Sequence, residues 1–157
     1  MIIEALVPDF MGKTRSIETF MDSNLEVFAQ NLETVKRLTK RVRDPRAGYE
    51  QTLNVLSYAK EYNSSIITKT SLMFGLGETE DEIRESFLDI QDSGVDVLTL
   101  GQYMRPTINH LPVTKWYSPQ EFEYYKDIAL DVGFLEVASG PMVRSSYRAD
   151  RIAHLVS

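Results

Sequence analysis

Residues 66–79 read IITKTSLMFGLGET, and this stretch decides the fold that we expect. An apolar run over residues 66–74 predicts a buried strand. It ends at the Gly75-Leu76-Gly77-Glu78 segment, whose glycines suit a tight turn. Thr79 and Glu82 then have the spacing of a capping box, which marks the start of a helix. The stretch therefore predicts a strand that passes through a glycine turn directly into a helix.

The same strand-to-helix order recurs on both sides of this stretch. Further short apolar runs occupy residues 2–7, 25–29, 95–100 and 134–138. Asp44 and Pro45 have the pattern of an N-cap followed by proline at the first helical position. Ser118 and Glu121 repeat the capping box, and Gly133 is placed to end that helix. Alternation of short strands with longer helices predicts an α/β fold with a parallel sheet.

Composition limits the classes of function. The 157 residues suffice for one domain with a buried core. A net charge of −6 argues against general nucleic-acid binding, and no apolar run is long enough to cross a membrane. The sequence has no cysteine, which excludes disulfides and any cysteine-held metal or iron–sulfur site built from this chain alone. His110 and His154 are far apart, so we do not expect a self-contained metal site.

The polar clusters lie where predicted strands end. They occupy residues 8–9, 30–33, 75–78, 101–106 and 140–147. In parallel α/β folds, ligands bind at the carboxyl ends of the strands. The sequence therefore predicts an enzyme-like site at this edge, although the pattern alone does not select a chemistry.

Two of these clusters each have two interpretations. The turn over residues 75–78 could offer its backbone to an anionic ligand, or it could be a simple turn in which Glu78 and Glu80 complement the helix dipole. Gln102, Tyr103 and Arg105 could hydrogen-bond a ligand or close the rim of the sheet.

Six cations lie within residues 36–46: Lys36, Lys40 and Arg37, Arg41, Arg43, Arg46. They could form an anion-facing patch or the solvated face of a helix. Arg43 lies just before Asp44-Pro45, and we expect it to point into the site.

Near the end of the chain, residues 144–147 read RSSY. Ser145 and Ser146 could form an anion-binding turn, supply a nucleophile or ligate a metal. A serine nucleophile needs a base, and no histidine is near in sequence, so a hydrolase is poorly supported.

Five ordered motifs together resemble the lipoyl synthases, which are radical-SAM enzymes. The motifs are EALVPDF (4–10), NLETV (31–35) with VRDPRA (42–47), MFGLGET (73–79), GQYMRPT (101–107) with HLPV (110–113), and RSSY (144–147). One departure is Gln30, where the family usually has histidine. The resemblance implies a partial TIM-type (βα) barrel, about strands three to six plus a C-terminal extension. Residues 1–157 would then be a single, incomplete domain.

The resemblance also implies cofactors and site residues. The complete enzyme uses S-adenosylmethionine and two 4Fe–4S clusters, whose two cysteine sets lie upstream of this region and are absent here. We expect this chain alone to bind neither cluster and to hold no catalytic residue by itself. Asn31, Glu33 and Arg43 would line the S-adenosylmethionine pocket, with Gly75 and Gln102 beside it.

Ser146 would ligate the auxiliary cluster, and its hard oxygen would suit an iron that must be released. Ser145 is the alternative ligand if the register differs by one.

The function implied is radical sulfur insertion at C6 and C8 of an octanoyl chain on a carrier-protein lysine. The partners would be an acidic lipoyl domain or a glycine-cleavage carrier, together with the missing N-terminal half, in the cytoplasm or the mitochondrial matrix. An alternative is a non-catalytic half-barrel that binds a lipoyl carrier or a nucleotide. For the truncated lipoyl synthase, the strand over residues 2–7 would have an unpaired edge, which favours self-association.

Overall fold

The computed structural model describes residues 3–7 and 13–144. Five parallel strands form one sheet in the order β1-β2-β3-β4-β5. They are β1 (Glu4–Leu6), β2 (Val27–Ala29), β3 (Ile67–Phe74), β4 (Val97–Gln102) and β5 (Glu136–Ser139). Within the described residues the sheet stays open between β1 and β5. The predicted α/β class and parallel sheet are confirmed, and the open sheet fits part of a TIM-type barrel.

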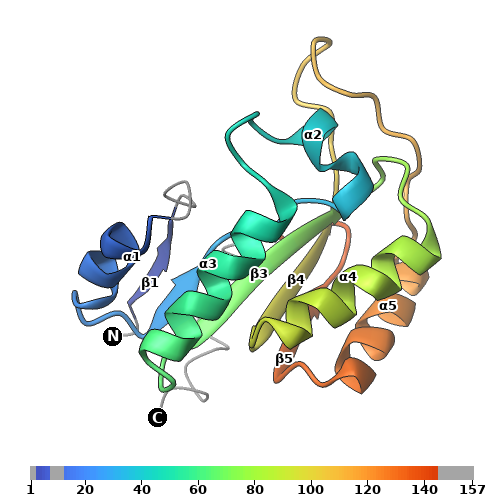
Figure 1. The fold of residues 1–157 in the computed structure, drawn as a ribbon. Coiled ribbons are helices and arrows are strands. Elements are labelled where there is room, and N and C mark those ends of the chain that lie inside the picture. Colours follow the sequence, from blue (N-terminus) through green and yellow to red (C-terminus); the bar gives the residue numbers. More distant parts are fainter. Residues whose placement is uncertain (1–2, 8–12, 145–157) are drawn as a thin grey trace.

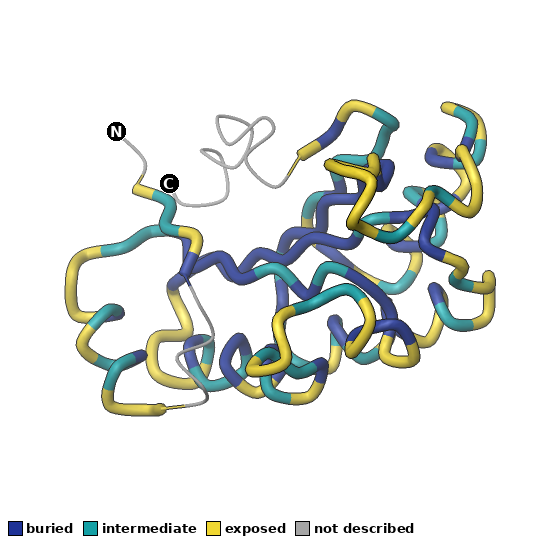
Figure 2. Tube along the Cα trace, turned by 90° about the horizontal axis from the view of Figure 1, so that it is seen from above, coloured by how far each residue is buried: buried dark blue, intermediate teal, exposed yellow. Residues whose placement is uncertain are grey.

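Helices alternate with the strands along the chain. They are α1 (Thr14–Met21), the 3₁₀ turn η2 (Lys36–Leu38), α2 (Thr39–Val42), α3 (Tyr49–Tyr62), α4 (Glu80–Asp92) and α5 (Pro119–Val132). Figure 1 shows α3, α4 and α5 side by side across one face of the sheet. Figure 2, seen from above, shows that the buried strands lie to one side of this helical layer. None of the helices in the described part of the chain is long and apolar enough to cross a membrane.

The register gives the two faces of the sheet different characters. Phe28, Leu72 and Leu98 lie on the helix-covered face and belong to the main apolar core. Alternate residues lie on the other face because side chains alternate along a strand. On that face Lys69 is buried, and its ammonium contacts Glu4 Oε1 of β1 at 2.8 Å. The face of the sheet opposite the helices thus carries polar and charged groups beside apolar ones such as Val27.

Two helix starts follow the predicted capping boxes. The Thr79 hydroxyl accepts from the Glu82 amide while Glu82 accepts from the Thr79 amide, and Ser118 and Glu121 repeat this exchange. Gly133 ends α5 at a φ of 122°, a left-handed value that favours glycine. These predictions are confirmed, because each depends on residues only a few positions apart.

The predicted helix start at Asp44-Pro45 is wrong. Helix α3 begins at Tyr49, with Gly48 as its N-cap. The Asp44 carboxylate instead accepts from the backbone and the guanidinium of Arg46, and the Asp44 carbonyl accepts from the Ala47 amide at 2.8 Å. Asp44 therefore closes a turn before the helix, a second role open to an Asp-Pro pair.

Candidate functional site

A cavity of about 210 Å³ lies at the carboxyl ends of β3 and β4. The residues that line it come from five predicted clusters or strands: Asn31, Glu33, Ser71, Leu72, Met73, Thr99, Gly101, Val143 and Arg144. Segments separated by up to about a hundred positions in sequence therefore converge here, at the edge where the sequence predicted a site.

Glu33 enters the cavity from an irregular continuation of β2. Its amide donates to the Ser71 carbonyl at 3.0 Å, and its carbonyl accepts from the Met73 amide at 2.8 Å. Its φ is 75°, a left-handed value that is uncommon for a residue other than glycine. Such local strain often accompanies a functional position, since the surrounding structure must enforce it.

Burial raises the pKa of the Glu33 carboxyl, while a hydrogen bond from Asn31 and the positive charge of Arg43 lower it. The raised pKa shows that desolvation outweighs these two effects. A cationic ligand group in the cavity would favour the ionised form of this carboxyl.

Arg43 lies close enough to act on Glu33 electrostatically, but the described lining of the cavity does not include it. Its Nη1 donates to Thr52 Oγ1 at 2.7 Å and to the Gly48 carbonyl at 3.3 Å. Arg43 therefore joins the end of α2 to the first turn of α3, so part of its guanidinium is engaged within the protein.

Arg144 reaches the cavity because Gly101 has no side chain. A Cβ at Gly101 would overlap the Val143 carbonyl oxygen. Only glycine therefore allows the backbone at Val143 to cross so close to β4. Arg144 Nη1 donates to the Val143 carbonyl at 2.8 Å, and Nη2 lies 3.4 Å from Met104 Sδ. The sequence identified the run over residues 144–147, and its first member does line the site; Ser145 and Ser146 lie outside the described residues.

Ser71 and Thr99 were not predicted as site residues. Their hydroxyls hydrogen-bond to each other across β3 and β4, on the face opposite the helices. Strand alternation was the signal available, because both side chains fall on the same face as Met73 and Lys69.

Gly75 and Gln102 lie just beyond the cavity wall. The Gln102 amide is buried, donates to the Lys115 carbonyl at 3.0 Å and accepts from the Tyr117 amide at 2.9 Å. A Cβ at Gly75 would overlap Gln102 Nε2 and lie 2.6 Å from the Lys115 carbonyl oxygen. Gln102 directly follows the lining residue Gly101, and Phe74 separates Gly75 from the lining residue Met73, but the described lining includes neither Gly75 nor Gln102.

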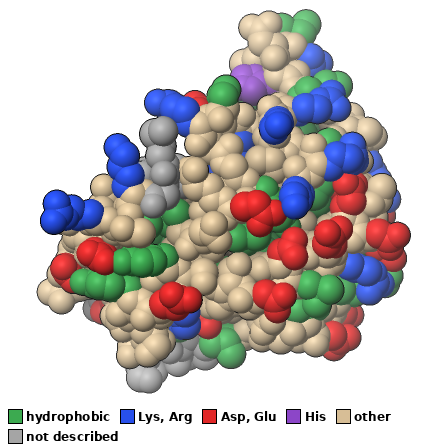
Figure 3. All heavy atoms as spheres, viewed as in Figure 1, with side chains coloured by type: hydrophobic (Ala, Val, Ile, Leu, Met, Phe, Trp, Pro, Cys, Tyr) green, Lys and Arg blue, Asp and Glu red, His purple; other side chains and the backbone are tan. Residues whose placement is uncertain are grey.

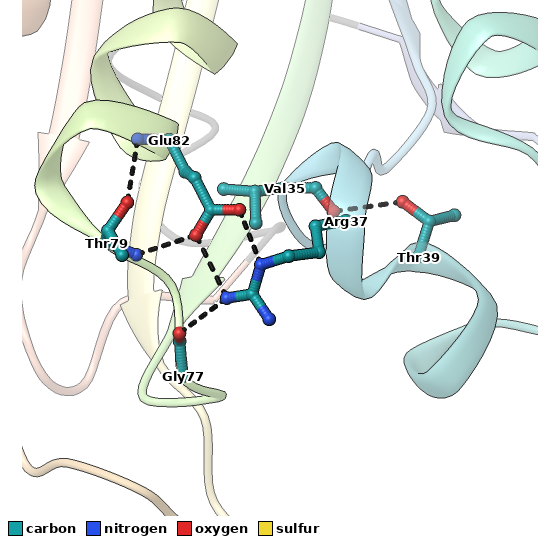
Figure 4. A network of polar contacts seen from close by, with 6 residues as sticks. All are labelled: Val35, Arg37, Thr39, Gly77, Thr79 and Glu82. Carbon is teal, nitrogen blue, oxygen red and sulfur yellow. Dashed lines mark hydrogen bonds and ion pairs between the residues drawn. The ribbon is translucent and has the colours of Figure 1, made fainter.

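Several cations of residues 36–46 are paired on the protein surface. Arg37 forms a bidentate contact with Glu82 at 2.7 and 3.0 Å and donates to the Gly77 carbonyl at 2.8 Å, as Figure 4 shows. Lys36 pairs with Glu50. The solvated-face interpretation therefore fits these side chains.

Figure 3 shows how charged side chains are distributed on the face of the molecule seen in Figure 1. Acidic side chains are concentrated on the right, over the region of α4 and α5 in Figure 1, and Lys and Arg lie mainly toward the top and the left. Within the described residues, no group of three or more His, Cys, Asp or Glu side chains could hold a metal ion.

The model of the Radical SAM superfamily matches residues 2–90 of the chain. The chain belongs to the radical SAM superfamily. The matched residues contain β1 to β3 and most of α4, which includes the Glu33 and Gly75 segments of the site.

Similar proteins identify a narrower group within this superfamily, the lipoyl synthases. The chain is 63% identical to a lipoyl synthase of Marinobacter nauticus over 96% of its own length and 43% of that relative. It is 58% identical to a lipoyl synthase of Thermus thermophilus, over 96% of the chain and 47% of the relative. The predicted resemblance to lipoyl synthases is thus confirmed, and the chain spans just under half the length of these relatives.

A solved structure shares the fold. The HMG-CoA lyase of Bacillus subtilis superposes with a TM-score of 0.54, covering 98% of this chain and 62% of that one. The sequence identity is 10%, so this likeness concerns the fold alone.

Proposed function

We propose that this chain is the C-terminal part of a lipoyl synthase and forms one side of its S-adenosylmethionine site. The observation that carries the proposal is the convergence of Asn31, Glu33 and Arg144 in one cavity. The cavity lies at the strand ends of a radical SAM chain that is 63% identical to a lipoyl synthase.

The side chains suit a zwitterionic ligand such as the methionine moiety of S-adenosylmethionine. The Glu33 carboxylate would accept from an ammonium group, and the Asn31 amide would hydrogen-bond polar groups beside it. Arg144 would attract a carboxylate. Arg43 would act through Glu33, since its charge favours the ionised carboxyl. Gly75 and Gln102 would support the cavity wall next to the ligand.

The residues present do not fit an iron–sulfur cluster by themselves. Such clusters are held mainly by cysteine thiolates, and this sequence has none. We therefore assign the cluster-binding cysteines to another part of the complete enzyme. Ser146 stays a prediction as the ligand that this chain would add to the auxiliary cluster.

The reaction proposed for the complete enzyme is sulfur insertion at C6 and C8 of an octanoyl chain on a carrier-protein lysine. Its substrate would be the octanoylated lipoyl domain or glycine-cleavage carrier, and its compartment the cytoplasm or the mitochondrial matrix. The part of this chain would be to bind and orient S-adenosylmethionine, with residues 1–157 as one domain of an incomplete barrel.

A ligand titration of the isotope-labelled chain tests this proposal. We expect S-adenosylmethionine and S-adenosylhomocysteine to shift the backbone amide resonances of Asn31, Glu33 and Arg144. Glu33→Gln should weaken binding by about tenfold, the effect of one charge-assisted hydrogen bond. Glu123→Gln changes an exposed acid on α5 and serves as the matched control. An absence of shifts at saturating ligand would contradict the proposal.

A non-catalytic binding module is the second candidate. Lys40 and Arg41 are exposed and form no ion pair with any other described residue, which leaves two cations available to an acidic partner. If this function holds, an acidic lipoyl domain should bind the chain without any cluster, and Lys40→Ala with Arg41→Ala should weaken that binding. Equal affinity of the unsubstituted and doubly substituted chains would argue against it.

A further inference from the structure

The turn over residues 75–78 directs its backbone amides at its own acidic side chain. The Gly75 amide lies 3.0 and 3.1 Å from the two carboxylate oxygens of Glu78. The Leu76 amide donates to Glu78 Oε1 at 3.2 Å. Successive amides that converge in this way form an anion-binding concavity. Here the anion is the carboxylate of the same chain.

A phenol completes the contacts of this carboxylate. The Tyr117 hydroxyl donates to Glu78 Oε2 at 3.0 Å. Burial raises the pKa of Tyr117, so the phenol keeps the proton that it donates. Its ring packs at 5.3 Å from the ring of Phe74, the last residue of β3. We refer to Gly75, Leu76, Glu78 and Tyr117 together as the Glu78 latch.

The latch connects two segments that are far apart in sequence. The Gly75 carbonyl accepts from the Thr114 amide at 2.7 Å, beside the contacts of Gln102 with Lys115 and Tyr117. Residues 114–117, which precede α5, are therefore held against the turn that precedes α4. On its other side the turn is held by Arg37 through the Gly77 carbonyl (Figure 4).

This connection lies directly behind the cavity. Met73 of β3 pairs with Gly101 of β4, and both residues line the cavity. The next pair along, Phe74 and Gln102, leads straight into the latch. Since the two strands end together, loosening the latch would free the ends of the strands that form the cavity wall.

We propose that Glu78 is a positioning residue, whose carboxylate occupies the Gly75–Leu76 amide concavity and fixes residues 114–117 behind the ligand cavity. The effect of Glu78 on ligand binding rests on the proposed function, whereas its place in the amide concavity is independent of that function. In one of the two interpretations of this turn from the sequence, Glu78 complements the helix dipole; the hydrogen bonds give it a more specific role.

Glu80 provides a matched control for Glu78. It is an acid at the start of the same helix, but among the described residues its carboxylate pairs with the Arg84 guanidinium alone, at 3.4 Å, and its side chain is about half exposed. A general effect of negative charge on the helix dipole would be shared by both acids. An effect of the latch belongs to Glu78 alone.

Amide exchange measured without ligand tests the latch. In Glu78→Ala we expect the amides of Gly75, Leu76 and Thr114 to exchange at least about tenfold faster, and in Glu80→Ala to keep their rates. Sodium acetate should restore protection in Glu78→Ala by filling the vacated concavity, whereas sodium chloride at equal ionic strength should not. Unchanged exchange in Glu78→Ala, or protection restored equally by chloride, would overturn the proposal.

Milder variants cover the case in which Glu78→Ala fails to fold. Glu78→Gln keeps one oxygen acceptor and Tyr117→Phe removes a single donor, so both should give intermediate exchange rates. Exchange as slow as in the unsubstituted chain for both variants would contradict the latch.

A ligand titration then tests whether Glu78 affects ligand binding in the cavity. Tyr117→Phe and Glu78→Gln should weaken binding of S-adenosylhomocysteine by several-fold, while Glu80→Ala should not. If the unsubstituted chain binds no S-adenosylhomocysteine, the proposed function fails while the exchange result still decides the latch. If it binds and these variants bind equally well, the positioning role fails alone.

Discussion

At the scale of the residue, Glu82 shows how one carboxylate can serve two purposes. It completes the capping box at the start of α4 and also accepts two hydrogen bonds from Arg37. The Arg37 guanidinium, followed by the Thr79 amide, lowers the pKa of Glu82 to about 2 against the opposing effect of desolvation. In the folded protein the Glu82 carboxyl therefore stays ionised at pH values well below the ordinary pKa of a glutamate.

This shift predicts a pH-dependent part of the free energy of unfolding. A carboxyl whose pKa is depressed in the folded state stabilises above its unfolded value of 4.5, and the effect is lost as pH falls toward about 2. Glu82→Gln should cost about 1 kcal/mol at pH 7, because the contacts are partly exposed. Urea unfolding between pH 2 and pH 7 measures this loss. The difference between the two proteins should shrink as the pH falls, and a constant difference would contradict it.

Gln30 predicts an effect of the opposite sign. It is buried, and neither polar atom of its amide has a hydrogen-bond partner among the described residues. Gln30→Leu should raise the free energy of unfolding by about 1–2 kcal/mol, because an unsatisfied buried amide is removed. Gln102→Leu is the control, since Gln102 is equally buried but fully bonded, and its replacement should destabilise. Thermal unfolding of both variants measures these opposite changes, and a Gln30→Leu variant no more stable than the unsubstituted chain would contradict the prediction.

At the scale of the element, a buried ion pair links strands that are not neighbours. Lys69 on β3 reaches Glu4 on β1, and Ala29 of β2 lies in register between Leu6 and Lys69. The small side chain of Ala29 leaves room for the lysine to cross β2. The pair therefore helps to fix β1 at the edge of the sheet.

Replacing one partner of this ion pair should lower the free energy of unfolding more than replacing both. Glu4→Gln leaves the buried ammonium of Lys69 without a counter-charge, and we expect a loss of about 3–5 kcal/mol. Adding Lys69→Met should restore most of the stability, because the buried charge is then gone. Denaturant unfolding of the single and double variants measures the difference. A double variant no more stable than Glu4→Gln would exclude this explanation.

Elements followed from the sequence wherever their signals were local. The five strands, the helices α4 and α5 and their two capping boxes depend on residues close in sequence, and they were predicted correctly, whereas α1 and α2 were not predicted. Asp44 was assigned to the wrong role because Asp-Pro suits both a turn and a helix start. Helix α3 begins instead from Gly48, four residues on, which has an extended N-cap conformation.

The site was less accessible to sequence reasoning. Asn31 and Glu33 were predicted and share a cavity, but the approach of Arg144 depends on the crossing at Gly101. The hydrogen bond between Ser71 and Thr99 depends on the register of β3 and β4, which no local pattern shows. The assignments of cofactor contacts to individual residues stay predictions.

At the scale of the whole molecule, the open sheet leaves β1 as an outer strand. Leu6 at its end is about half exposed (57%), and exposed apolar edges favour association between chains. Leu6→Lys should therefore reduce self-association of the isolated chain. Leu88→Lys is the control, since Leu88 is similarly exposed (55%) but lies on α4. Light scattering across a concentration series measures both. Equal association of the two variants would show that the edge is not responsible.

The crossing at Gly101 also has an evolutionary consequence. The barrier to substitution there is lack of space, so even alanine would displace the backbone that carries Arg144. Mutational tolerance at this codon thus reports whether the C-terminal segment must stay in place. In a saturation library of this chain sorted for resistance to proteolysis, position 101 should accept glycine alone, whereas exposed positions nearby should accept many residues.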